Sequence, residues 1–389
     1  MIDFLRNGAD AGTREVLLRM IVCLGCIAGL LISWKLWVSS RSYPLVPISE
    51  KLPAIRPPFD YVVFAALVIL PAMIAFSSRP RRFVFAFLFL AICLCALDQS
   101  RLQPWFYQYT MLLAAFAFYS SAARHTQLLN TSSLIISLVY FWSGVQKIGV
   151  GFVDRVFPVL INPYLHTLFG RVDVLPRWLI PAIPLIEIFI GVGLMTRKLR
   201  NVSAVIAVAM HLLILLLLVP LGVNRIVWPW NIAMIVLVMV LFWKRRDASL
   251  ADLVLPKRVG FQLFVLILFG VMPLLSFFNL WDAYLSSSLY SGNYKVAVIR
   301  ITDAVKNRLQ AGIQNQVEQV NGEWTISPVR WSLRELKVPA YPEPRVYRKV
   351  TKSICAFAED PTEVILTIYS EPHVLTGERT ATTYNCEAL

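Results

Sequence analysis

Three ionisable side chains fall inside apolar stretches of this 389-residue chain, where they could carry proton chemistry. Lys147 ends the run Tyr-Phe-Trp-Ser-Gly-Val-Gln-Lys, Glu187 follows Pro-Leu-Ile, and His211 precedes Leu-Leu-Ile. An amine, a carboxylate and an imidazole can each accept and donate protons, and burial tunes how readily they do so. We therefore predict Lys147, Glu187 and His211 as catalytic residues, and we predict no metal site.

Lys147 allows two interpretations. An ammonium group inside a bilayer costs about 3 kcal/mol or more unless it has a partner or water. Gly149 and Gly151 follow closely and end the helix, so the side chain could instead extend to the lipid headgroups at lower cost. Only an amine that stays inside the helical bundle is shielded enough from water to act as a base.

Glu187 and His211 are each twelve positions from Leu199, which marks the turn between two apolar segments. In an antiparallel helical hairpin, equal spacing from the turn means equal depth. We therefore expect Glu187 and His211 to face each other as a hydrogen-bonded pair. The pair would be either a structural clamp between helices or, with a chemical role, a proton-handling pair or quinone ligand.

The elements that hold these residues are apolar segments of transmembrane length. The composition is 57% hydrophobic and 15% charged, whereas soluble domains carry about 25% charged residues. We predict an all-α polytopic membrane helical bundle of about nine transmembrane helices in residues 1–282, followed by a small C-terminal α+β domain in 283–389. The nine predicted spans cover about 17–38, 61–76, 83–97, 109–122, 132–148, 178–195, 202–219, 228–243 and 261–280.

The net charge of +14 is concentrated in short loops rather than on one folded face, which argues against nucleic-acid binding. Basic clusters follow the second, fourth, sixth and eighth spans, which places the N-terminus in the cytoplasm and the C-terminal domain outside it. The expected location is the inner (plasma) membrane of a bacterium. The clusters are Arg79, Arg81 and Arg82; Arg124; Arg197, Lys198 and Arg200; and Lys244, Arg245 and Arg246.

Two groups of cysteines have different expectations. Cys355 and Cys386 are the only cysteines of the polar C-terminal part, so we predict a disulfide between them if that part is extracytoplasmic. Cys23 and Cys26 have the spacing of a redox motif, but in an apolar run they are more simply small buried hydrophobes.

Polar and aromatic residues also gather at the predicted outer ends of the spans. They could form the roof of a polar cavity that holds an aromatic ligand near Lys147. Alternatively, they could form an ordinary interfacial girdle that contains an Asp–Arg pair. The predicted substrate-binding residues are Asp98, Arg101, Trp105, Tyr107, Gln108, Trp228 and Asn231.

From about residue 98 to 243 the chain resembles the HTTM transmembrane domain of the vitamin K-dependent gamma-carboxylase group. The similar pieces are Tyr140–Lys147, Glu187 in its Pro-rich segment, His211-Leu, and Trp228-Pro-Trp-Asn-Ile-Ala-Met. Leu185–Arg200 is also similar to DoxX-like membrane proteins, which are linked to quinone chemistry. The resemblance implies that Lys147 is a base that deprotonates a reduced quinone, which would then be the cofactor.

Two functions remain open. The first is a quinol-linked carboxylase-like or oxidoreductase-like enzyme that binds an isoprenoid quinone in the lipid bilayer. The second is a non-catalytic membrane scaffold or assembly partner whose outer domain engages an extracytoplasmic protein partner. A transporter is disfavoured because the spans hold few charges and show no inverted repeat.

Overall fold

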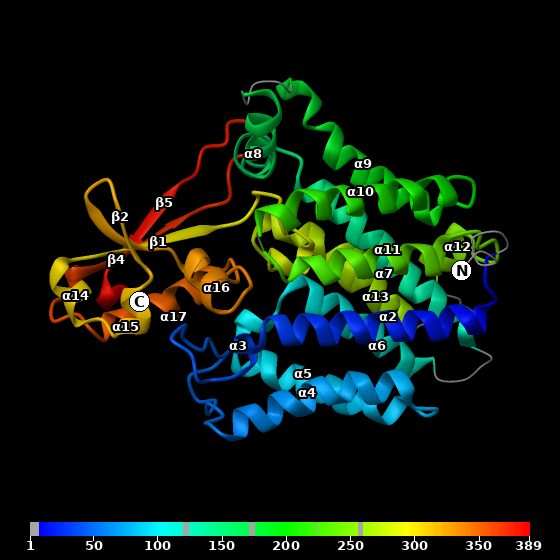
Figure 1. Ribbon diagram of the computed structural model, residues 1–389, viewed down its shortest axis with the longest axis horizontal. Helices are drawn as coiled ribbons and strands as arrows, with labels where there is room; N and C mark the ends of the chain where they lie inside the picture. The colour runs from blue at the N-terminus through cyan, green and yellow to red at the C-terminus, as the bar shows by residue number, and fades with distance from the viewer. Residues whose placement is uncertain (1–7, 120–123, 171–175, 223, 256–259) are drawn as a thin grey trace.

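The structure, a computed structural model, describes residues 8–119, 124–170, 176–222, 224–255 and 260–389. Helices occupy the chain as far as Phe278, and a small antiparallel sheet with its own helices follows from Val296 (Figure 1). The long helices run side by side, and the sheet region lies at one end of them. We call residues 293–389 the C-terminal region.

The helical part contains a helix in each of the nine predicted segments. The long helices are α2 (Ala11–Ile32), α4 (Phe59–Phe76), α5 (Arg81–Leu97), α6 (Pro104–Phe118), α7 (His125–Gln146), α9 (Ala182–Met195), α10 (Arg200–Leu221) and α11 (Val227–Phe242). The ninth segment is the short helix α13 (Phe261–Val265), which continues as a π-helical turn to Val271 and as 3₁₀ helix to Phe278. Shorter helices are α3 (Trp34–Trp37), α8 (Phe157–Phe169) and α12 (Leu250–Val254).

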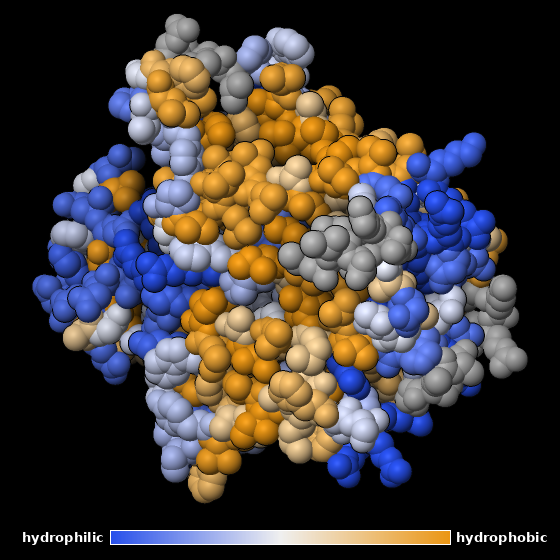
Figure 2. All heavy atoms as spheres, turned by 45° about the vertical axis from the view of Figure 1, so that its right-hand side comes forward, coloured by the Kyte–Doolittle hydropathy of each residue, from blue (hydrophilic) through white to orange (hydrophobic). Residues whose placement is uncertain are grey.

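Six helices in the described parts of the chain are long and apolar enough to cross a membrane. They are Ala11–Ile32, Phe59–Phe76, His125–Gln146, Arg177–Met195, Arg200–Leu221 and Phe261–Phe278. Figure 2 shows apolar side chains gathered in a central band between polar regions at the two ends of the molecule. These features are compatible with an integral membrane protein, whereas the predicted count of nine spans is not confirmed.

Helix α7 is the innermost of these six helices. Of its apolar window, 78% is buried inside the protein, against 39% or less for each of the other five. A helix surrounded by other helices can carry polar side chains without exposing them to lipid. Lys147 is the C-cap residue of α7, so it lies at the end of the most deeply buried of these helices.

The C-terminal region is built on a five-stranded antiparallel sheet in the order β2-β3-β1-β4-β5. The strands are β1 (Val296–Ile301), β2 (Val317–Val320), β3 (Glu323–Ile326), β4 (Val364–Tyr369) and β5 (Ala381–Tyr384). The helices are α14 (Asp303–Arg308), α15 (Ala311–Gln314), α16 (Pro328–Glu335) and α17 (Pro344–Cys355). Alternate residues of β1 are buried, as expected for a strand with one face on a core.

Short-range sequence signals set the start of one helix in this region. Ser327 caps α16 by accepting a hydrogen bond from the Arg330 amide, and Pro328 takes the first helical position. Strands β4 and β5 pair as an antiparallel hairpin, and the predicted disulfide joins Cys355 and Cys386. Cys23 and Cys26 are buried free thiols rather than a bonded pair.

One hairpin is an addition to the predicted elements. Strands β2 and β3 pair around Asn321 and Gly322, which both have positive φ. An Asn-Gly dipeptide between two short strands is a strong hairpin signal, because both central residues of a type I′ turn need positive φ. This signal was present in the sequence.

Candidate functional site

Lys147 is buried and paired. Its Nζ donates hydrogen bonds to Oε2 of Glu187 at 2.7 Å, to Oγ of Ser143 at 2.6 Å and to the Ser143 carbonyl oxygen at 3.2 Å. The Lys147 and Glu187 side chains are only 9% and 8% exposed. Of the two positions open to this lysine, the structure therefore has the one inside the bundle.

Two glycines allow this pairing because they let α7 and α9 approach closely. A Cβ at Gly191 of α9 would lie 2.6 Å from the Phe141 amide nitrogen of α7. A Cβ at Gly144 of α7 would lie 2.5 Å from the Pro184 carbonyl oxygen of α9. Small residues at such contacts let helix backbones pack together in membranes. Lys147 is one turn from Gly144, and Glu187 is one turn from Gly191, so both reach the same seam.

His211 is held by two neutral partners. Asn231 donates its Nδ2 to the Val227 carbonyl oxygen at 2.7 Å, so its Oδ1 accepts from Nδ1 of His211 at 2.7 Å. Nε2 of a neutral His211 is then free to accept from the Tyr140 hydroxyl, 2.5 Å away. This chain of bonds crosses from α11 through α10 to α7.

The predicted hydrogen-bonded pair of Glu187 and His211 is not what forms among the described residues. Glu187 binds Lys147, and both imidazole nitrogens of His211 are occupied by Asn231 and Tyr140. Both side chains nevertheless line one cavity. A full positive charge is the stronger partner for a carboxylate, and no property of the hairpin alone revealed that α7 would supply it.

The cavity beside these groups has a volume of about 120 Å³. Lys147, Glu187, His211 and Tyr140 line it together with aromatic and apolar side chains. For comparison, an engineered apolar cavity of about 150 Å³ takes up one benzene molecule. The volume therefore suits a single aromatic ring.

Three predicted substrate-binding residues, Tyr107, Gln108 and Asn231, also line this cavity. Tyr107 stacks on Phe269 with ring centroids 4.8 Å apart, and its buried hydroxyl has no hydrogen-bond partner in the described structure. An unsatisfied buried hydroxyl is costly, and a ligand group is one way to satisfy it. Gln108 accepts from Trp230 Nε1 at 3.3 Å and so holds a second aromatic side chain in place.

An apolar groove of about 560 Å³ adjoins this ring-sized cavity. Lys147 and Glu187 line both spaces, as do Met210, Ile214 and Tyr290. The rest of the groove consists of apolar side chains from α8, α9, α10 and the turn before α8. The polar pair thus stands at the boundary between a small ring-sized cavity and a larger hydrocarbon-lined space.

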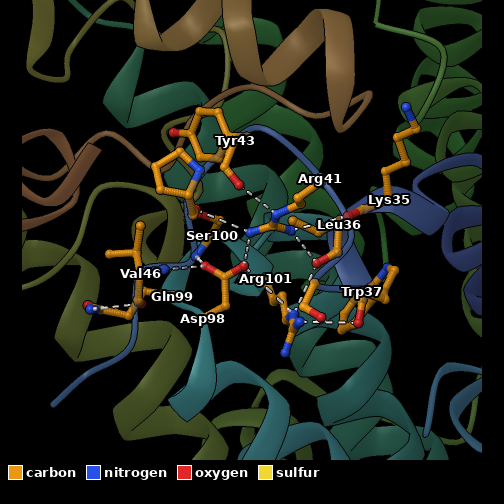
Figure 3. Close-up of polar contacts among 12 residues, drawn as sticks. Lys35, Leu36, Trp37, Arg41, Tyr43, Val46, Asp98, Gln99, Ser100 and Arg101 are labelled. Carbon is orange, nitrogen blue, oxygen red and sulfur yellow. Dashed lines mark hydrogen bonds and ion pairs between the residues drawn. The ribbon is translucent and has the colours of Figure 1, made fainter. Parts of the chain in front are cut away.

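The structure places the other predicted substrate-binding residues elsewhere. Figure 3 shows Asp98 facing the guanidinium groups of Arg41 and Arg101. Asp98 also accepts hydrogen bonds from the backbone amides of Ser100 and Val46, while Arg101 donates to the carbonyl oxygens at residues 36, 37 and 94. These contacts hold the loop after α3 against the end of α5. They match the Asp–Arg pair of the alternative interpretation, not a ligand site.

Trp105 and Trp228 are outside the described lining of the cavity as well. The Trp105 ring packs against Gly29 of α2 and contacts Phe106 and Tyr109. The ring centroid of Trp228 lies 5.9 Å from the guanidinium carbon of Arg225. Both tryptophans are packing or interfacial residues in this structure.

Sequence reasoning missed Tyr140 and Ser143 as members of the site. Both lie on the same face of α7 as Lys147, because they precede it by seven and four residues. That spacing was readable from the sequence. Tyr284 and Tyr290 also line the cavity, but they come from the segment after the last apolar helix, and only the folded chain brings them there.

Comparison of the chain with protein-family models, with curated proteins and with solved structures gave no significant match. The chemistry of the site therefore stands on its geometry.

Proposed function

We propose that this chain is an integral membrane enzyme that binds a hydroquinone beside Lys147 and uses the lysine as a base. The observation that carries the proposal is the Lys147–Glu187 pair at the wall of a ring-sized cavity, where the Tyr107 hydroxyl has no hydrogen-bond partner among the described residues. The reaction class is quinol-linked and carboxylase-like or oxidoreductase-like. It agrees with what the resemblance to the carboxylase-type transmembrane domain implies for Lys147.

The lining fits a hydroquinone by its chemistry. The stacked Tyr107 and Phe269 rings offer an apolar wall, and the Tyr107 hydroxyl and Lys147 amine offer two polar contacts for ring oxygens. A bound hydroquinone supplies reducing equivalents to the site. The adjoining apolar groove gives any hydrocarbon substituent of the ring a place outside water.

Glu187 gives Lys147 a way to work as a base. A lysine can accept a proton only as the neutral amine, and in this pair Glu187 can hold the proton that the amine gives up. Moving a proton within the pair changes no net charge in the cavity, so it avoids burying a new unpaired ion. The amine can then take a hydroxyl proton from the ring, while Ser143 keeps Nζ in place.

The test uses the purified full chain in detergent with ubiquinol-1, a single-ring hydroquinone that carries one isoprenoid unit, as the probe. We expect Lys147→Gln to keep hydroquinone binding but to lower its aerobic consumption by about 100-fold or more, the usual worth of a positioned base. Lys147→Arg should fail equally, because a guanidinium does not give up its proton. Lys198→Gln, at an exposed lysine, is the matched control and should behave as wild type.

Equal consumption by wild type and both Lys147 variants, or no binding of the probe at all, would sink the enzyme proposal. The chain would then be better described as a membrane scaffold whose C-terminal region engages another protein.

The proposed topology has nine crossings, a cytoplasmic N-terminus and an extracytoplasmic C-terminal region. It is supported by a helix in each of the nine segments, by the basic loops and by the Cys355–Cys386 disulfide, which needs an oxidising compartment. Alkaline phosphatase fused after Leu389 should be active in bacterial cells, and the same enzyme fused after Lys198 should be inactive. The reverse pattern would overturn this orientation.

A further inference from the structure

A second cavity, of about 440 Å³, lies between the helical part and the C-terminal region. Its walls come from the end of α7, from residues 276–283 and from three separate stretches of the C-terminal region. The cavity is polar, unlike the two spaces beside Lys147. No step of the proposed quinol chemistry uses it.

Four charged side chains in its wall form two ion pairs, and each pair has no net charge. Arg345 donates to Asp282 with both Nη atoms, one of them at 3.0 Å, and Lys295 Nζ lies 2.8 Å from Glu371 Oε1. Each of these four side chains has an opposite charge in contact.

Glu343 is the carboxylate left over. Its Oε1 accepts a hydrogen bond from the Ala283 amide at 3.0 Å, and the nearest cation, Arg345, is 3.9 Å away and already bound to Asp282. Among the described lining residues, three carboxylates thus face two basic side chains, with His373 as the remaining titratable group. Glu343 is only 8% exposed, so solvent screens little of this excess when its carboxyl group is ionised.

Aromatic groups line the same space. The rings of Phe277 and Trp281 are in the wall, and aromatic faces attract organic cations. The buried Trp281 Nε1 has no hydrogen-bond partner in the described structure, so it is a donor in want of an acceptor.

We propose that this cavity binds a small organic cation that also carries a hydrogen-bond acceptor, such as an amino alcohol. The ammonium group pairs with Glu343 between the rings of Phe277 and Trp281, and the hydroxyl or ester oxygen accepts from Trp281 Nε1. Such a ligand restores charge balance and satisfies the orphan donor together. The proposal does not depend on the quinol chemistry, because it uses none of the residues beside Lys147.

The experiment measures binding of ethanolamine and choline to the purified full chain in detergent by calorimetry in phosphate buffer. Saturable binding with a Kd on the order of 1 mM is the expected result for ligands of this size. We expect Glu343→Gln to weaken it roughly tenfold or more, which is the loss of one charge-assisted contact. Glu323→Gln, at an exposed glutamate of β3, is the matched control and should bind as wild type.

One further variant separates binding from folding. Trp281→Phe keeps an aromatic ring but removes the hydrogen-bond donor. It should weaken the binding of ethanolamine and choline and leave the Cys355–Cys386 disulfide formed. Failure of wild type to saturate up to roughly 50 mM of either amine would overturn the proposal. Equal affinity in Glu343→Gln and wild type would overturn it as well.

The ammonium can come from a free solute or from a lipid headgroup. Reconstitution into phosphatidylethanolamine vesicles, compared with phosphatidylglycerol vesicles, tells these sources apart. Loss of ethanolamine binding only in phosphatidylethanolamine identifies the headgroup as the occupant. Equal binding in both identifies a free amine.

Discussion

At the scale of single residues, the Lys147–Glu187 pair is costly to bury. Burying two charges costs several kcal/mol per ion, and their attraction compensates only with good geometry and further hydrogen bonds. Ser143 supplies those bonds to the amine from one turn away. A pair of this kind is weak evidence for stability as such, so its presence at a cavity wall favours a chemical role.

We expect the pair to be strongly coupled energetically. Glu187→Gln leaves the ammonium buried without a counter-charge and should lower the free energy of unfolding by about 3–5 kcal/mol. The double variant Lys147→Gln/Glu187→Gln removes both charges and should cost clearly less than the sum of the two single variants. Denaturant titration in detergent gives all four values, and additive costs would contradict the paired geometry.

Glu343, in the C-terminal region, should make the stability of the protein depend on pH. Burial, and next the charge of Asp282, raise the pKa of Glu343 from its ordinary value of 4.5 to about 7. The folded protein therefore binds an extra proton between these pH values, so this contribution to stability is full below about pH 4.5 and is lost as the pH rises through 7.

The measurement is the melting temperature between pH 5 and 8 in buffers free of organic amines. The melting temperature of wild type should fall as the pH rises. In Glu343→Gln this fall should be smaller by about 5 °C across the range. Parallel curves for the two proteins would show that Glu343 titrates normally. Glu323→Gln serves again as the control that should leave the wild-type slope unchanged.

At the scale of elements, the seam between α7 and α9 decides whether Lys147 meets Glu187. The seam is built on backbone contacts at Gly144 and Gly191, where any side chain would strike main-chain atoms. Main-chain atoms of a helix cannot move aside individually, so an added methyl group must separate the helices.

Gly191→Ala should therefore destabilise the protein by about 2 kcal/mol and weaken the Lys147–Glu187 contact. The matched control is Gly270→Ala, where a new methyl group meets only side-chain atoms, the end of Leu266 at 3.2 Å and the end of Leu138 at 3.6 Å. Thermal unfolding in detergent compares the two substitutions. If both variants melt at the same temperature, the close approach of α7 and α9 is not what holds the site together.

At the scale of the whole molecule, the C-terminal region is tied to the helical part by side-chain contacts with loops. Glu335 at the end of α16 accepts hydrogen bonds from the backbone amides of Ser42 and Tyr43, at 2.6 and 2.9 Å. Lys349 of α17 pairs with Glu50 at 2.7 Å. These contacts tie the C-terminal region, which supplies Glu343 to the polar cavity, to the loop between α3 and α4.

Glu335→Ala should loosen that docking, since two backbone amides lose their acceptor. A lost partner costs about 1–3 kcal/mol, so exchange of the Ser42 and Tyr43 amides with solvent should speed up by about tenfold or more. Hydrogen-exchange mass spectrometry reads this change directly. The control Glu323→Ala should leave exchange at Ser42 and Tyr43 as in wild type.

The sequence by itself determined the local features of this protein. Apolar run length placed the helices, the Ser327-Pro328 signal placed the start of α16, and two lone cysteines identified the disulfide. Their equal spacing from the turn predicted that Glu187 and His211 lie near each other, and both line one cavity. Each of these depends on neighbouring residues or on composition, which a chain carries without folding.

Only the tertiary structure decided which polar groups meet. Asp98 pairs with Arg41, 57 positions away in the chain, and Glu187 pairs with Lys147 rather than with His211. Helices of uniformly apolar composition carry little information about their rotation around their own axes, so depth was predictable but facing was not. The physical reason is that rotation is set by packing, here by the glycine contacts of α7 and α9.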